Sequence, residues 1–352
     1  MFPMMFRALI LSVMAVLLPV TGQADALRRA NLAGLSGSER LRQFAVGQAI
    51  LEHRGDPGVA QAMRASLQQS GFYHSGARPG ILSRSAQIDP VLAYDANING
   101  GFLNDRFEIF GLSFDIDPSR LALAGMIGGA RANGQMRLAY GEGRYLDLRG
   151  SVEAVYAPQH DIGRAQAGFE ACARNHLRGW SFADLCVTGA SSWRALSQDT
   201  SGSVSLSFAQ LHAGGNSAHE FTAGVSRSLF GATAQNAVSM GWQAVWNRAV
   251  TGLEVTLAAP VAGETVMRQR LQGSVSWDAR GRAVRLGAWH QLADGGMLLG
   301  VARVDRVSGV SLSVQARPGV TVEVMHQVTQ STLSMFDERR SGLSLRFDLG
   351  RR

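Results

Sequence analysis

Residues 341–349 read SGLSLRFDL, and this stretch carries the pattern that decides the fold. Four apolar residues alternate there with three polar ones: Leu343, Leu345, Phe347 and Leu349 against Ser344, Arg346 and Asp348. A period of two is typical of a β-strand with one apolar and one polar face. A strand of a soluble β-sandwich shows the same alternation. Whether the strand belongs to a soluble protein or to a membrane protein therefore depends on the rest of the chain.

The end of the chain also resembles a known targeting sequence. A polar residue followed by Gly342, Leu345 and Phe347 is similar to the C-terminal signal of bacterial outer-membrane barrels, which their insertion machinery reads. We therefore interpret Gly342, Leu345 and Phe347 as a barrel assembly signal. The expected partners are the barrel insertion machinery and the lipids of the outer membrane.

Residues 1–26 have the features of a secretory signal peptide. Arg7 supplies the positive charge, residues 8–20 form a short apolar core, and Ala24-Asp25-Ala26 is an A-x-A cleavage site. No cysteine follows that site, so the mature chain is not itself a lipoprotein. We expect export and, with the C-terminal signal, location in the bacterial outer membrane.

The composition excludes a helical membrane protein. Mean hydropathy is only +0.01, and past the N-terminus no apolar run reaches the roughly 20 residues of a spanning helix. Near-neutral hydropathy is what alternation between lipid and lumen produces. The net charge of +7 comes from arginines alone, spread along the chain rather than clustered with aromatic residues, so we expect no nucleic-acid partner.

A short helical hairpin is expected between the signal peptide and the strands. Ser36 and Glu39 have capping-box spacing, Pro57 suits a first helical position, and Gly71 ends the second helix. The period changes to two from Ser83 onward. We therefore predict three parts: a signal peptide at 1–26, a periplasmic helical hairpin and linker at 27–80, and a barrel at 81–352.

The region from 83 to the end predicts a meander of strands that closes on itself. Its period-two segments are mostly 9 to 12 residues long, which matches tilted membrane strands of roughly 9–11 residues. Short turns are expected at 132–134, 278–281, 293–296 and 317–319. Residues 135–156 form one strand or two, and 106–116 span or do not, so the count is 14 or 16. The fold class is a transmembrane antiparallel β-barrel.

Cys172 and Cys186 are the only cysteines, and both belong to the exported part of the chain. The oxidising periplasm allows a disulfide, which we predict between them. A bridge closing a loop of ~15 residues stabilises by roughly 3 kcal/mol in the chain-entropy model. Counting strands back from the C-terminus places residues 199–202 in a periplasmic turn and 158–180, with Cys172, in an external loop.

The sequence shows no catalytic or metal site, and we expect neither an enzyme nor a cofactor. His212, His219, His290 and His326 lie on predicted strands, but nothing ties one of them to a nucleophilic serine, and no G-x-S-x-G occurs. The loop that begins at Asp95 looks like a calcium loop, yet its twelfth position is Arg106 and not glutamate.

Residues 94–101, YDANINGG, and 110–118, FGLSFDIDP, resemble the start of the barrel domain in the surface lipoprotein assembly modifier (Slam) family. In that family a Y-D-x-N-x-N strand end leads into a loop with G-L-x-F-x-[LI]-D-P. The matching residues here are Tyr94, Asp95, Asn97, Asn99, Gly111, Phe114, Asp117 and Pro118. The resemblance implies fourteen strands and a role in moving lipoproteins to the cell surface. The family's tetratricopeptide-like repeats are reduced here to about one helical pair.

Three functions follow from these observations. The first is assistance in the surface export or display of a lipoprotein or other secreted client. The alternative is a passive pore, in which Arg285, Arg303 and Arg346 favour anions while Asp305 and Asp348 temper that preference. A structural or adhesive surface barrel is the third, with the disulfide-tied loop as its contact surface. The sequence leaves open whether the helical hairpin fills the lumen or hangs beneath it.

Overall fold

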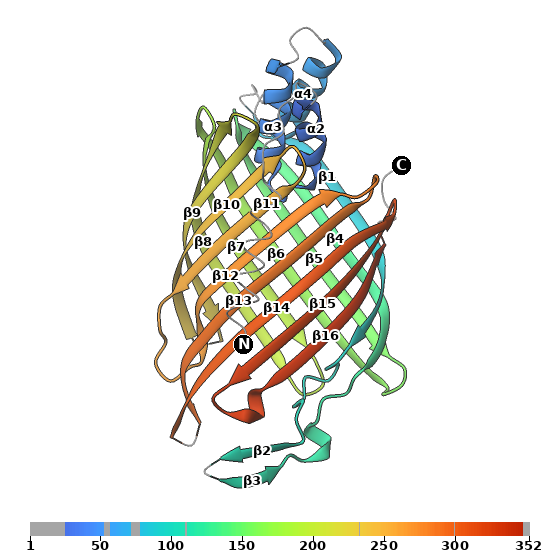
Figure 1. Ribbon diagram of the computed structural model, residues 1–352, viewed down its shortest axis with the longest axis vertical. Helices are drawn as coiled ribbons and strands as arrows, with labels where there is room; N and C mark the ends of the chain where they lie inside the picture. The colour runs from blue at the N-terminus through green and yellow to red at the C-terminus, as the bar shows by residue number, and fades with distance from the viewer. Residues whose placement is uncertain are drawn as a thin grey trace.

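The computed structural model describes residues 25–52, 57–71, 78–109, 111–231, 233–298 and 300–347. Fourteen antiparallel strands close into one barrel, because each strand pairs with its neighbours in sequence and the last strand pairs back onto the first (Figure 1). The predicted transmembrane antiparallel barrel is confirmed, and of the two predicted counts the structure has fourteen strands. A closed barrel satisfies its backbone hydrogen bonds without leaving an edge strand, as a bilayer requires.

The barrel strands follow the chain without crossovers. They are β1 (Gly80–Asp95), β4 (Gly125–Gly141), β5 (Arg144–Ala157), β6 (Ile162–Arg178), β7 (Ser181–Trp193), β8 (Gln198–Gly214), β9 (Ser217–Phe230), β10 (Thr233–Trp246), β11 (Val250–Ala258), β12 (Val266–Asp278), β13 (Ala283–Leu298), β14 (Val301–Arg317), β15 (Val320–Ser331) and β16 (Glu338–Phe347). The short strands β2 (Arg106–Ile109) and β3 (Leu112–Asp115) form a separate hairpin outside the barrel.

Alternation gives each strand an apolar outer face and a polar inner face. On β8, Val204, Leu206 and Phe208 are 40 to 53% exposed on the outside of the barrel, and serines occupy the positions between them. Side chains exposed to this extent are stable on a lipid-facing surface and costly in water. The period-two pattern therefore indicates a barrel wall whose outer face contacts lipid.

Two uncertainties about strands and turns are now settled. The turn between Gly141 and Arg144 divides residues 135–156 into two strands, and β2 is too short to span. The predicted turns at 278–281 and 317–319 lie at strand junctions. Those at 132–134 and 293–296 were wrong: the first lies within β4, and the second is a register shift within β13.

The helices precede the barrel. They are α2 (Asp25–Leu32), α3 (Glu39–Glu52) and α4 (Pro57–Gln69), with the 3₁₀ turn η1 (Ala33–Leu35) after α2. Two further 3₁₀ turns lie between barrel strands: η2 (Pro118–Arg120) before β4 and η3 (Ser334–Phe336) before β16. Ser38 caps α3, since its Oγ accepts a hydrogen bond from the Leu41 amide at 3.1 Å. The predicted Ser36–Glu39 capping box was wrong, and Glu39 contacts the barrel wall instead. None of the described helices is long and apolar enough to cross a membrane.

The two ends of the barrel differ, and this gives its orientation. At the end that carries the helices, two to four residues join consecutive strands; the opposite end has the long segment 96–124 with the β2–β3 hairpin (Figure 1). Outer-membrane barrels have short periplasmic turns and longer external loops. We therefore name the helix end periplasmic and the hairpin end external.

Two of the sequence predictions, the signal peptide and the last strand, fall partly outside the described residues. Residues 1–24, which hold most of the predicted signal peptide, lie outside the described residues, as do Asp348 and Leu349. The division at residues 26 and 80 stays a prediction; the structure has α2 from Asp25 and β1 from Gly80.

Candidate functional site

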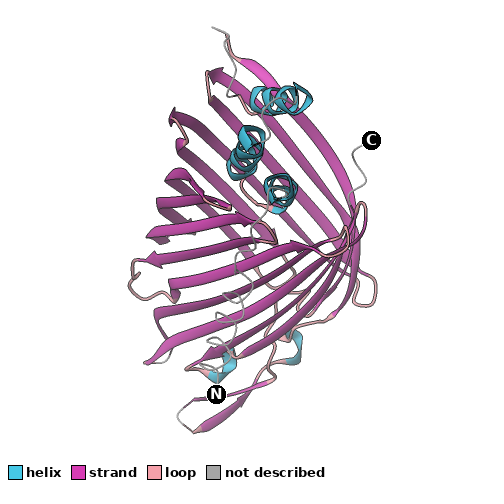
Figure 2. Cartoon of the chain, turned by 45° about the horizontal axis from the view of Figure 1, so that its top comes forward, coloured by secondary structure: helices cyan, strands magenta, loops and turns pink. Residues whose placement is uncertain are grey.

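Residues 25–52 and 57–71, here called the helical plug, occupy the periplasmic mouth of the barrel, partly inside the ring of strands and partly beyond the strand ends (Figure 1, Figure 2). Leu41 and Phe44 of α3 pack in one buried cluster with inward-facing wall residues. The wall residues of this cluster are Phe182, Ala209, Leu211, Ala218, Val245 and Val250, from five neighbouring strands. Burying one such side chain stabilises by roughly 1.5–3 kcal/mol, so the cluster holds the plug against the β7–β11 wall.

The position of the plug against this wall was not predicted, although the sequence contains a pattern that points to it. At the periplasmic ends of β7, β8 and β10, apolar residues also occupy the inward positions: Phe182, Leu211 and Val245. A lumen-facing position filled by a large apolar side chain needs another surface to cover it. Apolar residues at inward positions near the periplasmic strand ends were thus the sequence signal that the hairpin enters the lumen.

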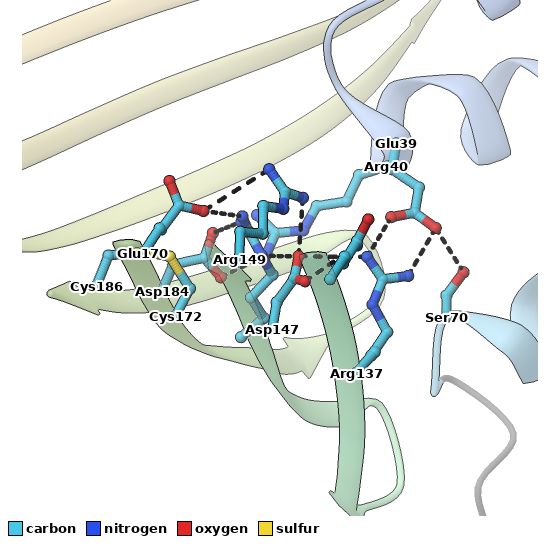
Figure 3. Close-up of polar contacts among 12 residues, drawn as sticks. Glu39, Arg40, Ser70, Arg137, Asp147, Arg149, Glu170, Cys172, Asp184 and Cys186 are labelled. Carbon is cyan, nitrogen blue, oxygen red and sulfur yellow. Dashed lines mark hydrogen bonds and ion pairs between the residues drawn. A yellow bond between two sulfur atoms is a disulfide. The ribbon is translucent and has the colours of Figure 1, made fainter. Parts of the chain in front are cut away.

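Charged contacts join α3 to the nearby strands β4 and β5 (Figure 3). Arg137 on β4 donates to both carboxylate oxygens of Glu39, at 3.0 and 2.8 Å, and to Asp147 on β5 at 3.3 Å. Burial alone raises the pKa of Glu39, but the hydrogen bonds and charge of Arg137 outweigh burial, so the pKa lies below the ordinary value of 4.5. Glu39 is therefore held as a carboxylate.

A second ion pair joins the next residue of α3 to the wall. Arg40 donates to Asp184 on β7, and their side chains are only 11% and 7% exposed. Asp184 also accepts from Arg174 at 3.0 Å, and Arg174 lies 3.5 Å from Asp147. One continuous network of carboxylates and guanidinium groups thus runs from the plug into the lumen wall.

The last described residues of the plug also contact a turn of the barrel. The Gly143 amide, in the turn before β5, donates to the Gly71 carbonyl at 2.7 Å, and the Gly143 carbonyl accepts from His176 at 2.9 Å. Gly143 has φ +62°, and a Cβ there would lie 2.7 Å from the His176 Cβ. Only glycine fits this contact.

The predicted disulfide is present, but its place differs from the prediction. Cys172 on β6 and Cys186 on β7 are directly opposite in register and are bonded to each other on the lumen face. The predicted external loop at 158–180 was wrong, because residues 162–178 form β6 and only 158–161 connect it to β5. Residues 199–202 are likewise part of β8 and not a periplasmic turn. The bridge joins two strands of the wall that carry Arg174 and Asp184.

Beside the plug, the lumen contains a polar cavity of about 400 Å³. Its wall comes from β9 to β16 and includes both signs of charge, with Glu254, Arg285, Glu323 and Arg346 among serine, glutamine and glycine residues. Arg346 lies 3.3 Å from Glu323, and Glu254 accepts from Gln272 at 2.7 Å. The prediction that Arg285 and Arg346 face the lumen is confirmed.

The remaining predicted lumen charges form a local pair. Arg303 binds Asp305 at 2.6 Å, and its guanidinium lies 3.4 Å from the centre of the Phe336 ring. Asp305 is buried and also accepts from Ser331 at 2.7 Å. These two residues order the external end of β14 against η3 and contribute little free charge to the lumen.

The first half of the Slam-like motif holds the start of the long external segment. Asp95 pairs with Arg164, and the Asn99 side chain donates to the Leu121 carbonyl at 2.7 Å and accepts from the Leu123 amide at 2.9 Å. Asn97 donates to the Gly101 carbonyl at 2.8 Å. These bonds hold Ile98, which is fully buried, against the inward-facing Ile127, Val155 and Ala157. The segment therefore covers part of the external mouth.

The other motif residues lie apart from this cluster. Tyr94 is 44% exposed on the outer face, Gly111 has φ +74° in the β2–β3 turn, and Phe114 stacks on Phe107 with ring centres 5.2 Å apart. Asp117 caps η2, where Pro118 is the first residue. The backbone and side chain of Ser119 both donate to Asp117 and lower the pKa of that carboxyl. The motif is thus a set of turn and cap residues rather than one site.

The residues of the proposed assembly signal lie on β16. Leu345 pairs with Val322 on the outward set of positions, and Gly342 pairs with Met325 on the inward set. Phe347, the last residue of β16, pairs with Val320. The signal itself stays a prediction.

The strand histidines face the membrane side of the barrel. His290 contacts the Ser308 Oγ at 2.9 Å, and His326 contacts the Ser341 Oγ at 2.8 Å. His219 lies against Trp242 and Trp246 near the periplasmic rim. Within the described ranges no group of three histidine, cysteine or acidic residues could hold a metal ion.

Fold and lumen define the chain as a plugged, fourteen-stranded β-barrel of the outer-membrane type. No protein-family model and no curated protein sequence matches it. The resemblance to the Slam family therefore still rests on residues 94–101 and 110–118 alone.

Several solved structures are similar to this chain at low sequence identity and with TM-scores below 0.5. Acinetobacter baumannii OccAB3 is 8% identical with a TM-score of 0.41, and the alignment covers 75% of this chain and 98% of that one. Pseudomonas aeruginosa OccK2 (OpdF) in complex with glucuronate is 9% identical with a TM-score of 0.40, over 76% and 99% of the two chains. Pseudomonas aeruginosa OpdK with vanillate is 12% identical with a TM-score of 0.36, over 77% and 89%.

Proposed function

We propose that the protein is a channel of the bacterial outer membrane through which small polar solutes diffuse along the part of the lumen that the plug leaves free. The observation that carries this proposal is the polar cavity on the β9–β16 wall, beside the plug. Hydroxyl, amide and charged groups of both signs line it, as a water-filled passage requires. Ion pairs fix the plug against the barrel wall. The fixed plug therefore sets the width of the passage that remains beside it.

Arg285 gives the channel its expected ion preference. It faces the cavity and has no hydrogen-bond or ion-pair partner among the described residues, whereas Arg346 is paired with Glu323. An unpaired guanidinium in a narrow lumen attracts anions and repels cations. Replacing Arg285 with Ala should shift the reversal potential, measured in planar bilayers under a salt gradient, toward cation preference.

Solute uptake by liposomes tests the route. Ser313 lines the cavity, and its neighbour Val314 belongs to the outward set of β14. Ser313→Trp should slow the swelling of proteoliposomes in small sugars and amino acids several-fold because the indole fills the passage. Val314→Trp, on the lipid side of the same strand, should swell like the wild-type protein. Equal swelling of the two variants would contradict a route along this wall.

Export of a lipoprotein or other secreted client is the second candidate, and the residues that support it are the Slam-like motif at 94–101 and 110–118. A polypeptide could pass only if the plug and its buried ion pairs moved aside. Liposomes that contain the purified barrel should be assayed for solute swelling and for passage of a co-expressed lipoprotein. Passage of the lipoprotein through a barrel that excludes small solutes would favour export over the channel.

A further inference from the structure

A basic patch lies on the outer face of the barrel near the external ends of β13 to β16. We call it the lipid-face patch; it consists of Arg306, Gln330, Arg339, His290 and His326. Register places its members side by side, since Arg306 pairs with Gln330, and Arg339 pairs with Val328, the residue two positions before Gln330.

Strand alternation shows that both arginines of the patch face outward. On β14, Arg306 shares its parity with Val310 and Leu312, which are 49% and 42% exposed on the outer face. On β16, Arg339 shares its parity with Leu343, which is 49% exposed. Arg306 and Arg339 are themselves exposed.

Neither guanidinium has a partner in the part of the chain that the structure describes. Among the described residues, Arg306 and Arg339 make no hydrogen bond and no ion pair. The lumen arginines of the same strands are paired with carboxylates: Arg303 with Asp305, Arg340 with Glu338 and Arg346 with Glu323. Two unpaired cations at the edge of an apolar surface are costly unless an anion from outside the chain meets them.

The depth of the patch indicates where that anion lies. Arg339 lies eight positions before Phe347, the periplasmic end of β16. At a rise of ~3.3 Å per residue and a tilt of ~40°, this spans roughly 20 Å along the membrane normal, close to the external border of an apolar band ~25 Å tall. The arginines therefore lie at the head-group level of the outer leaflet.

Below the arginines, the same face is polar for one row and then apolar. His290 and His326 lie beside their serine partners, and Val310, Leu312, Val324 and Leu343 continue toward the periplasm. This sequence of guanidinium groups, hydrogen-bonding side chains and an aliphatic surface matches phosphate, sugar hydroxyls and acyl chains in that order.

We propose that the lipid-face patch is a binding site for a phosphorylated, multiply acylated glycolipid of the outer leaflet, with Arg306 and Arg339 on its phosphate oxygens. The acyl chains then lie over the aliphatic side chains of β14 to β16. This site faces the membrane and is independent of solute passage through the lumen.

Native mass spectrometry of the full chain in detergent micelles, titrated with diphosphoryl lipid A, tests the site. The variant Arg306→Gln/Arg339→Gln should bind the lipid at least about tenfold more weakly, since each arginine makes a charge-assisted hydrogen bond to phosphate. Arg84→Gln, an exposed arginine on the outward set of β1 near the periplasmic end, is the matched control and should bind normally. Heat-modifiable migration confirms that each variant is folded.

A second comparison separates the lipid from other phosphates and does not depend on the glutamine variant. Monophosphoryl lipid A should bind the wild-type protein several-fold more weakly than the diphosphoryl form, and inorganic phosphate at the same concentration should not displace either lipid. Wild-type affinity of the double variant, an equal loss in Arg84→Gln, or displacement by inorganic phosphate would each overturn the proposal.

Discussion

The ion pair between Arg40 and Asp184 offers the sharpest test of how the plug is held. Arg40→Met keeps the aliphatic stem of the side chain and removes the guanidinium, whose Cζ lies 4.4 Å from the centre of the Phe182 ring. Asp184, whose side chain is 7% exposed, is then left with Arg174 alone. Removing one partner of a buried pair costs about 3–5 kcal/mol, and the remaining contact with Arg174 places the expected value at the lower end.

A loss of about 3 kcal/mol corresponds to a roughly hundredfold increase in the fraction of molecules with a released plug. Hydrogen exchange of the α3 amides measures that fraction directly, because released helices exchange. Single-channel recordings of the same variant should show more frequent openings to a higher conductance.

The exposed Arg42, two residues further along α3, provides the matched control. Arg42→Met should leave exchange and conductance at wild-type values. The variant Arg40→Met/Asp184→Asn, which removes both charges, should be less perturbed than the sum of its single changes. Equal exchange in Arg40→Met and Arg42→Met would refute the conclusion that this ion pair holds the plug.

Four further predictions follow from other parts of the structure. Because the pKa of Glu39 is lowered in the folded protein, its ion pair with Arg137 stabilises the plug fully above pH 4.5. This stabilisation is lost as the pH falls through the lower, folded-state pKa. Channel openings of the wild-type protein should therefore increase as the pH falls below 4.5, and those of Glu39→Gln should not. Leu312→Arg should lower the free energy of unfolding in liposomes by ~2–4 kcal/mol because the charge faces lipid, and Ser311→Arg, on the lumen side, should not. Cys172→Ser/Cys186→Ser should unfold at lower urea, with a loss of roughly 3 kcal/mol, and reductant should have no further effect. Phe347→Ala should reduce the amount of heat-modifiable protein in outer-membrane fractions, and a normal amount would count against the assembly signal.

The membrane wall could be predicted from the sequence because its physical cause is local. Each strand alternates between lipid and lumen, so a period of two is written into consecutive residues such as Val204, Leu206 and Phe208. The disulfide was predictable for a similar reason, since an exported chain with two cysteines has one pairing available. The turns were harder to predict than the strands. Asn133-Gly134 has the composition of a hairpin turn, yet pairing with β1 and β5 keeps these two residues in the middle of β4.

Only the tertiary structure decided what fills the lumen. Sequence alone determined that this chain forms a one-layer wall of alternating strands, because that pattern depends on neighbouring residues. It did not determine that Glu39 meets Arg137 or that Arg40 meets Asp184, since these partners are separated by 98 and 144 positions. Strand tilt and register bring distant inward positions to the same height in a barrel. The plug, the cavity beside it and the patch on the outer face exist only once the barrel has closed.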